Sequence, residues 1–218
     1  MPKTIVTTQT IYQFDELSDD AKEKARAWYR EGNLDHEWWD AVYEDAAQCA
    51  AILGIDIAPR GKYGHEIWFS GFWSQGDGAC FAGTYSWKAC AKAMRDHAPK
   101  DSELHAIADT LTALSHGEGW SASMKHRGHY YHSGCMSVDV SFDDDWYRQI
   151  DSGLEDPQDL PQAEFTAGEE TITQAMRDFA DWIYKQLERE HDWLQADEQV
   201  DESILANEYE FTESGERA

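Results

Sequence analysis

Apolar residues recur at helical spacing in two segments near the start of the chain. Ser18 is a suitable N-cap for the first helix, which we expect over 19–31. The second helix should begin after Asn33 or Asp35 and end at Gly54, because apolar residues repeat there every three or four positions. These positions are Trp39, Val42, Tyr43, Ala46, Ala50 and Leu53.

The period changes to two in the middle of the chain, where alternating apolar and polar residues predict antiparallel strands. We expect strands near 65–70, 80–87, 126–132 and 135–142. The glycine-punctuated segment 71–78 should connect the first two strands. Ser133 and Gly134 should form a two-residue turn between the last two, which would make a tight hairpin.

Helical spacing returns in the second half of the chain. We expect helices at about 87–97 and 102–115, a loop over 143–165 and a final short helix near 201–206. Thr166 and Glu169 have the spacing of a capping box, which predicts that a long helix begins there. Apolar residues after the box recur at intervals of three, four or seven, so this helix should have one buried face.

Together these elements predict a single α+β domain over 1–218. An antiparallel sheet of about four strands should pack against several helices, among them the long C-terminal helix. The acidic C-terminal part, 143–218, should pack on the sheet.

Charge and aromatic content narrow the class of protein. Asp and Glu number 43 against 18 Lys and Arg, a formal net charge of −25, while aromatic residues make up 13% of the chain. A disordered acidic chain is poor in aromatic residues because it has little to bury, so we expect most of this chain to fold. The acidic balance argues against direct binding to nucleic acid or to an anionic membrane, since both attract a basic excess.

The cysteines and the N-terminal segment indicate the cellular compartment in which the protein is expected. Four cysteines without C-x-x-C spacing indicate neither a zinc ribbon nor a disulfide scaffold. The N-terminal segment has no apolar core of the kind found in signal peptides, and no stretch approaches the roughly 18 apolar residues of a transmembrane helix. We therefore expect a soluble protein of the host cell cytoplasm.

The negative charge is concentrated toward the C-terminus. Residues 1–142 hold 20 acids and 13 bases, a balance of −7, whereas residues 143–218 hold 23 acids and 5 bases, a balance of −18. A solvated face explains a single acidic helix, but rows of carboxylates also imitate phosphates and suit a basic groove of another protein. The candidate contact residues are Asp143, Asp144, Asp145, Asp178, Asp181, Glu188 and Asp192, with the loop aromatic Trp73.

Two segments could carry other chemistry. His126, His129 and His132 suggest a metal site, but on a strand His129 points away from the other two, which are about 20 Å apart. His126 and His132 share the polar face with Asp139, so these three are weak metal candidates, and structural histidines are favoured. The turn 76–78, Gly-Asp-Gly, could present a carboxylate for proton or cation chemistry, although ordinary turn formation explains it better.

Five segments carry a family resemblance. They are YQFDELSDDAKEKARAWYRE, the tandem Trp38-Trp39, FSGFWSQGDGACFAG, HYYHSGCMSVDV and ILANEYEFTESGER. In this order, from about residue 10 to 215, they resemble a family of uncharacterised proteins encoded by phages and prophages, some of which are labelled antitoxins of toxin–antitoxin systems. The resemblance brings no catalytic residues. It implies a phage context, in which small acidic proteins often inhibit host defence, including anti-CRISPR and antirestriction proteins that imitate DNA.

These observations lead us to expect a non-enzymatic inhibitor that needs no cofactor. It would be a phage-encoded DNA mimic whose partner is a host protein or ribonucleoprotein complex with a basic nucleic-acid-binding surface, such as a CRISPR effector or a restriction enzyme. One alternative is an antitoxin that neutralises a protein toxin. Another is an enzyme that uses Asp77 of the 76–78 turn together with the polar face of the 126–141 hairpin.

Overall fold

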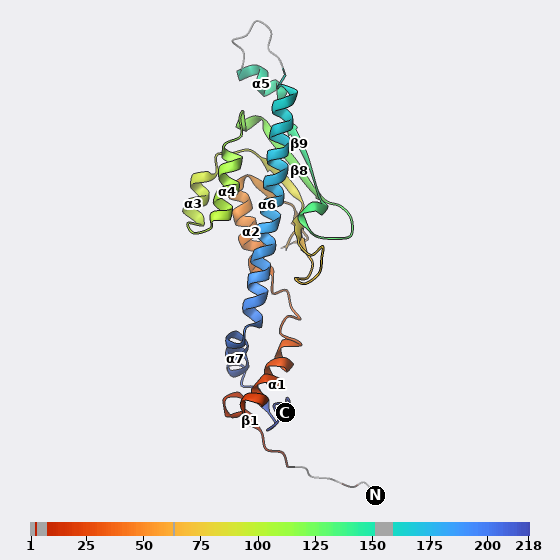
Figure 1. Ribbon diagram of the computed structural model, residues 1–218, viewed down its shortest axis with the longest axis vertical. Coiled ribbons are helices and arrows are strands. Elements are labelled where there is room, and N and C mark those ends of the chain that lie inside the picture. Colours follow the sequence, from red (N-terminus) through yellow and green to blue (C-terminus); the bar gives the residue numbers. More distant parts are fainter. Residues whose placement is uncertain (1–2, 4–7, 63, 151–158) are drawn as a thin grey trace. The chain divides into compact units, whose positions relative to one another are not determined.

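The structure is a computed structural model (Figure 1), and it describes residues 3, 8–62, 64–150 and 159–218. Packing divides the chain into two compact units. The larger unit is Asp40–Glu188, and the smaller unit combines Met1–Trp39 with Arg189–Ala218. The division falls within the long helix α6 (Gln162–Gln195). That the two units make up one domain, as expected from the sequence, stays a prediction.

Among the described residues, the smaller unit contains both end segments of the chain, two complete α-helices and the end of α6. Helix α1 (Asp19–Arg30) begins where the Ser18 side chain accepts a hydrogen bond from the first turn, as the sequence predicted. Strand β1 (Tyr12–Gln13) pairs antiparallel with β10 (Glu210–Phe211), and helix α7 spans Asp197–Ala206. The unit thus joins segments that lie almost 200 positions apart in the sequence.

Apolar side chains from each of these segments form one core. The buried residues are Phe14, Leu17, Ala21, Ala25, Val200, Ile204 and Phe211. Ion pairs between α1 and α7 border this core: Arg26 Nε lies 2.6 Å from an oxygen of Asp201, and Arg30 pairs with Asp197. The core explains why α1 and α7, each only a few turns long, are stable where they are.

A four-stranded antiparallel sheet organises the larger unit and bears out the α+β fold class. Its order is β2 (Ile55–Ile57), β7 (Gly83–Ser86), β8 (Trp120–His126) and β9 (Met136–Phe142). Two short ladders accompany it: β5 (Ile67–Phe69) with β6 (Ala79–Phe81), and β3 (Pro59–Arg60) with β4 (Gly64–His65).

The larger unit also contains helices. Those that the structure describes are α2 (Asp40–Leu53), α3 (Ala91–His97), α4 (Ser102–Thr112), α5 (Asp144–Ile150) and the first part of α6, with α3 packed on α4 (Figure 1). Helix α6 meets the strands at Phe179, whose ring centroid lies 5.6 Å from that of Phe81. No helix in the described part of the chain is long and apolar enough to cross a membrane.

The strand predicted over 80–87 is two strands. β6 ends at Phe81 and pairs with β5, whereas β7 begins at Gly83 and pairs with β2 and β8. Gly83 lies so close to the backbone of Asp56 that a Cβ atom would overlap it. A glycine therefore allows the close approach at which the chain passes from one sheet to the other.

The tight hairpin predicted over 126–132 and 135–142 is wrong in its first strand. β8 ends at His126, which pairs with Met136 at the start of β9. Residues 127–135 connect the two strands, and Gly128 in this connection has a φ of 98°, which favours glycine. The buried alternation lies earlier in the chain, at Trp120, Ala122 and Met124.

The start of the long helix also differs from the prediction. α6 begins at Gln162, and the Thr166 hydroxyl donates to the Gln162 carbonyl at 3.0 Å, so Thr166 lies inside the helix and caps nothing. The loop predicted over 143–165 is wrong where α5 occupies it. Its central part, 151–158, lies outside the described residues.

Candidate functional site

Helices α4 and α6 of the larger unit are held together by the Asp101 carboxylate. One oxygen accepts from the backbone N–H groups of Glu103 and Leu104, at 3.1 and 3.0 Å, and thereby caps α4. The other oxygen accepts from Trp182 Nε1–H of α6 at 2.8 Å. A single charged side chain thus fixes the N-terminus of α4 against α6.

Between these helices lies a groove of about 440 Å³, which we call the α4–α6 groove. Small side chains such as Ala106 and Ala175 leave the space open, and three carboxylates line it: Glu103, Asp178 and Asp181. The Lys185 ammonium also lines the groove and lies 2.7 Å from Glu103. Three carboxylates and one ammonium leave a balance of −2, so the groove suits a positively charged side chain.

Two of the seven predicted contact carboxylates therefore belong to this groove. Asp178 and Asp181 are both exposed on α6, and Asp178 accepts a hydrogen bond from Gln174 Nε2 at 2.8 Å. Glu103 completes the set, although the sequence did not single it out. Its position on a different helix, 75 residues before Asp178, explains why spacing did not reveal it.

The carboxylates of the acidic run 143–145 form hydrogen bonds and an ion pair with nearby residues. Asp143 Oδ1 accepts from the N–H of Trp146 at 2.9 Å, and Asp144 Oδ1 accepts from the N–H of Leu160 at 3.1 Å. Asp145 pairs with Arg148 at 2.7 Å. The contacts of Asp143 and Asp144 give these two a structural role around α5, whereas the Asp145 side chain is 85% exposed and solvent screens its ion pair.

The remaining two carboxylates lie in different units. Glu188 ends the larger unit, and Asp192 belongs to the smaller unit, where its Oδ1 lies 3.5 Å from His191 Nδ1. Burial, together with the negative charges of Asp77 and Glu188, raises the pKa of Tyr184 above its usual value. The seven predicted residues are therefore several local features, of which Asp178 and Asp181 are the pair that lines a groove.

The glycine-rich loop is organised by Asp77. Its Oδ2 accepts from the N–H groups of Trp73 and Ser74, at 3.0 and 2.6 Å, which is ordinary turn chemistry. The Tyr184 hydroxyl donates to the Gly71 carbonyl at 2.9 Å and holds the loop to α6. Trp73 is 81% exposed at the tip, as a contact residue would be.

The structure brings this loop against the histidine segment. A Cβ atom at Gly78 would come within 2.6 Å of the His132 side chain. His132 Nδ1 accepts from the N–H of Gly134 at 3.1 Å, and its Nε2 lies 3.3 Å from Cys135 Sγ. His126 lies between aromatic rings, 5.3 Å from Trp68, and its Nε2 is 3.1 Å from the Tyr130 carbonyl.

Over the described residues, the three weak metal candidates from the sequence are not brought together as a metal site. His126, His132 and Asp139 do not come together as a ligand group within the described part of the chain. Asp139 lies on β9 opposite Ser123, and the rings of both histidines contact their own segment. The loss of the predicted hairpin register accounts for this, because the shared face depended on it.

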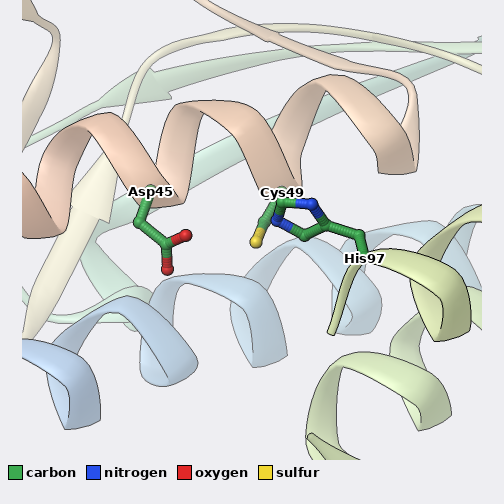
Figure 2. Close-up of side chains that lie close together, drawn as sticks. All are labelled: Asp45, Cys49 and His97. Carbon is green, nitrogen blue, oxygen red and sulfur yellow. The ribbon is translucent and has the colours of Figure 1, made fainter. Parts of the chain in front are cut away.

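A different group of possible ligands does come together. Asp45 and Cys49 lie one turn apart on α2, and His97 is the last residue of α3 (Figure 2). One ligand atom from each lies within 4.8 Å of the others. In Figure 2 the Cys49 thiol and the His97 ring are neighbours, and the Asp45 carboxylate is directed toward the same space.

The burial of these residues limits their chemistry. Cys49 is 1% exposed, and burial, aided by the charge of Asp45, raises the pKa of its thiol to about 12. A nucleophilic cysteine needs a low pKa and access to substrate, so a cysteine–histidine catalytic pair does not fit. The i, i+4 spacing of Asp45 and Cys49 was visible in the sequence, but His97 is 48 residues beyond Cys49, and only packing joins it to them.

Comparison with known proteins gives one family. A family model described as "Domain of unknown function (DUF8835)" matches residues 38–197. A search of curated proteins and a search of solved structures find no match. The matched segment includes the α4–α6 groove and the Asp45, Cys49 and His97 group.

Proposed function

The chain belongs to the DUF8835 family of domains of unknown function, and we propose that it is a non-enzymatic acidic inhibitor. Its partner would be a host defence complex with a basic nucleic-acid-binding surface, such as a CRISPR effector or a restriction enzyme. A phage origin and imitation of DNA belong to the same proposal. The observation that supports it most is the pair Asp178 and Asp181, exposed along the α4–α6 groove.

The groove has the composition of a receptor for basic side chains. Carboxylates approach it from two helices, and the alanines between them provide room for an aliphatic stem. A guanidinium can bind carboxylates with two parallel hydrogen bonds, as it binds a phosphate. A partner arginine that binds a DNA phosphate could therefore bind Asp178 or Asp181 in its place.

Charge elsewhere on the molecule would assist the encounter. The larger unit holds 25 acids and 11 bases, a balance of −14, and the smaller unit holds 18 acids and 7 bases, a balance of −11. Both units are thus acidic, and together they give the full −25. A charge of this size attracts a basic surface over distances of about a Debye length, roughly 10 Å at 0.1 M salt.

Nuclease inhibition tests the proposal. Purified restriction endonucleases and RNA-guided effectors would cleave a labelled DNA with increasing amounts of the full chain present. We expect inhibition that excess substrate DNA overcomes and that weakens as salt rises, because DNA competes for the same basic surface and salt screens the attraction to it. Failure to inhibit any nuclease of the panel would contradict the proposal.

A matched pair of variants locates the site. The double variant Asp178→Lys/Asp181→Lys should raise the concentration for half-inhibition about tenfold or more, because partner arginines then meet like charges. The control Asp56→Lys/Glu118→Lys changes the net charge equally at exposed positions outside the groove lining. Equal effects of the two variants would mean that the groove is not the contact.

A further inference from the structure

We propose that Asp45, Cys49 and His97 bind a zinc-like divalent transition-metal ion and leave its fourth coordination position open. The proposal does not depend on the inhibitory function. It rests on the convergence, donor chemistry and surroundings of three side chains in the larger unit (Figure 2).

The three ligand atoms already lie almost as close to one another as the ligands of a bound ion would. They lie within 4.8 Å of one another. With metal–ligand bonds of about 2.0–2.3 Å, tetrahedral geometry places neighbouring ligand atoms about 3.3–3.8 Å apart. Asp45 and His97 are exposed, so small side-chain rotations close the difference, whereas the buried Cys49 is a fixed point.

The donor set selects the class of metal. On binding, the ion would displace the Cys49 thiol proton to solvent. The resulting thiolate, with an imidazole and a carboxylate, suits zinc and similar borderline ions, whereas calcium and magnesium prefer oxygen ligands alone. Three protein ligands leave a tetrahedral ion one further position, which water or an outside ligand would take. The exposed Asp45 and His97 place that position toward solvent, with Cys49 beneath the ion.

The surroundings leave these ligands available. Within the described residues, the Asp45 carboxylate and the His97 ring have no hydrogen bond or ion pair. The neighbouring Asp101 has both oxygens engaged, in the α4 cap and with Trp182, so it does not compete for the ion. His126 and His132, in contrast, contact backbone or cysteine atoms of their own segment.

A bound ion would link α2 to the end of α3. Because the three ligands come from two helices, the folded chain presents them together and the unfolded chain does not. Metal should therefore stabilise the folded state by mass action. Zinc at about a hundred times its dissociation constant should raise the melting temperature by roughly 5–10 °C.

Cobalt(II) provides a direct spectroscopic test. The full chain, freed of metal with a chelator, would be titrated with cobalt and then with zinc. We expect one cobalt ion per chain, a thiolate-to-cobalt charge-transfer band in the near ultraviolet and tetrahedral visible bands, all of which zinc abolishes. A folded chain that binds no cobalt would overturn the proposal.

Variants assign the ligands. Cys49→Ser should remove the charge-transfer band, and Asp45→Asn and His97→Gln should each weaken cobalt binding about tenfold or more. The last two are exposed and should fold normally, so the test does not depend on the buried position. The controls Cys90→Ser and Asp96→Asn alter a buried cysteine and an exposed carboxylate outside the group, and should bind as the natural chain does. Unaltered binding in Asp45→Asn and His97→Gln would also overturn the proposal.

Discussion

At the scale of single residues, a glycine in α6 sets how closely this helix approaches the sheet. A Cβ atom at Gly168 would overlap the indole ring of Trp120 on β8. That ring has little freedom to move, because its Nε1–H donates to the Ser115 carbonyl at 2.8 Å. It also packs against Phe142, with ring centroids 4.7 Å apart. The glycine is therefore required by packing, in spite of its low helix propensity.

Gly168→Ala should destabilise the larger unit by about 1–3 kcal/mol. The methyl group forces Trp120 out of a filled site, which outweighs the gain of about 1 kcal/mol in helix propensity. Urea unfolding followed by near-ultraviolet circular dichroism measures the change. Glu170→Ala, exposed on the same helix, is the control and should stay within about 0.5 kcal/mol of the natural chain. A more stable Gly168→Ala would show that Trp120 relaxes freely.

At the scale of elements, the α4–α6 groove exists because α6 is held to the first turn of α4 by Trp182 and Lys185. Helix α4 has 11 residues and would be marginal on its own. Asp101 both caps it and accepts from Trp182 of α6, so the same carboxylate starts the helix and docks it. The position of Glu103 opposite Asp178 and Asp181 follows from this contact.

Asp101→Ala should cost about 2–4 kcal/mol of unfolding free energy, the sum of a lost cap and an unsatisfied indole N–H. Asp101→Asn keeps an oxygen for the cap amides but turns its NH2 donor toward the indole N–H, so its loss should be smaller than that of Asp101→Ala by about the worth of the cap. Hydrogen exchange should show the α4 amides opening first in Asp101→Ala.

Asp109→Ala serves as the control for Asp101→Ala. It breaks an exposed ion pair with Arg95, 2.6 Å long, and should have a far smaller effect because solvent screens that pair. Equal losses in Asp101→Ala and Asp101→Asn would contradict a role for the cap hydrogen bonds of Asp101.

At the scale of the whole molecule, repulsion among carboxylates opposes folding. The balances of −14 and −11 in the two units leave few cations to offset neighbouring acids. Some of the cationic side chains already form ion pairs, as Arg26 does with Asp201 and Glu23. The excess negative charge should therefore produce a negative electrostatic potential over the surface, and salt should weaken this potential.

Raising sodium chloride from about 10 mM to about 500 mM should raise the melting temperature by a few degrees, because screening relieves repulsion more than it weakens exposed pairs. Differential scanning calorimetry measures the shift. Asp178→Lys/Asp181→Lys changes the net charge from −25 to −21 and should show a smaller rise. A melting temperature that falls with salt would show that ion pairs such as Arg26–Asp201 dominate.

Local sequence patterns predicted the α+β fold class, most of the helices and the exposed positions of Asp178 and Asp181, but they missed α5 and the starts of α2 and α6. Ser18 and the apolar spacing after it predicted α1 almost to its ends, because a cap and its helix lie within a few residues of each other. The exposed positions of Asp178 and Asp181 followed from the same helical period. Such signals are local, so a single chain contains them before it folds.

The strand register and the ligand groups depend on tertiary packing. Trp120 at the start of β8 packs against Gly168 of α6, 48 residues later in the chain, and the pattern over 126–132 could not reveal this contact. Glu103 joins Asp178 and Asp181, and His97 joins Cys49, through helix packing between distant segments. Spacing along the chain records neighbours within a turn or a strand pair, whereas these contacts depend on which surfaces are buried together.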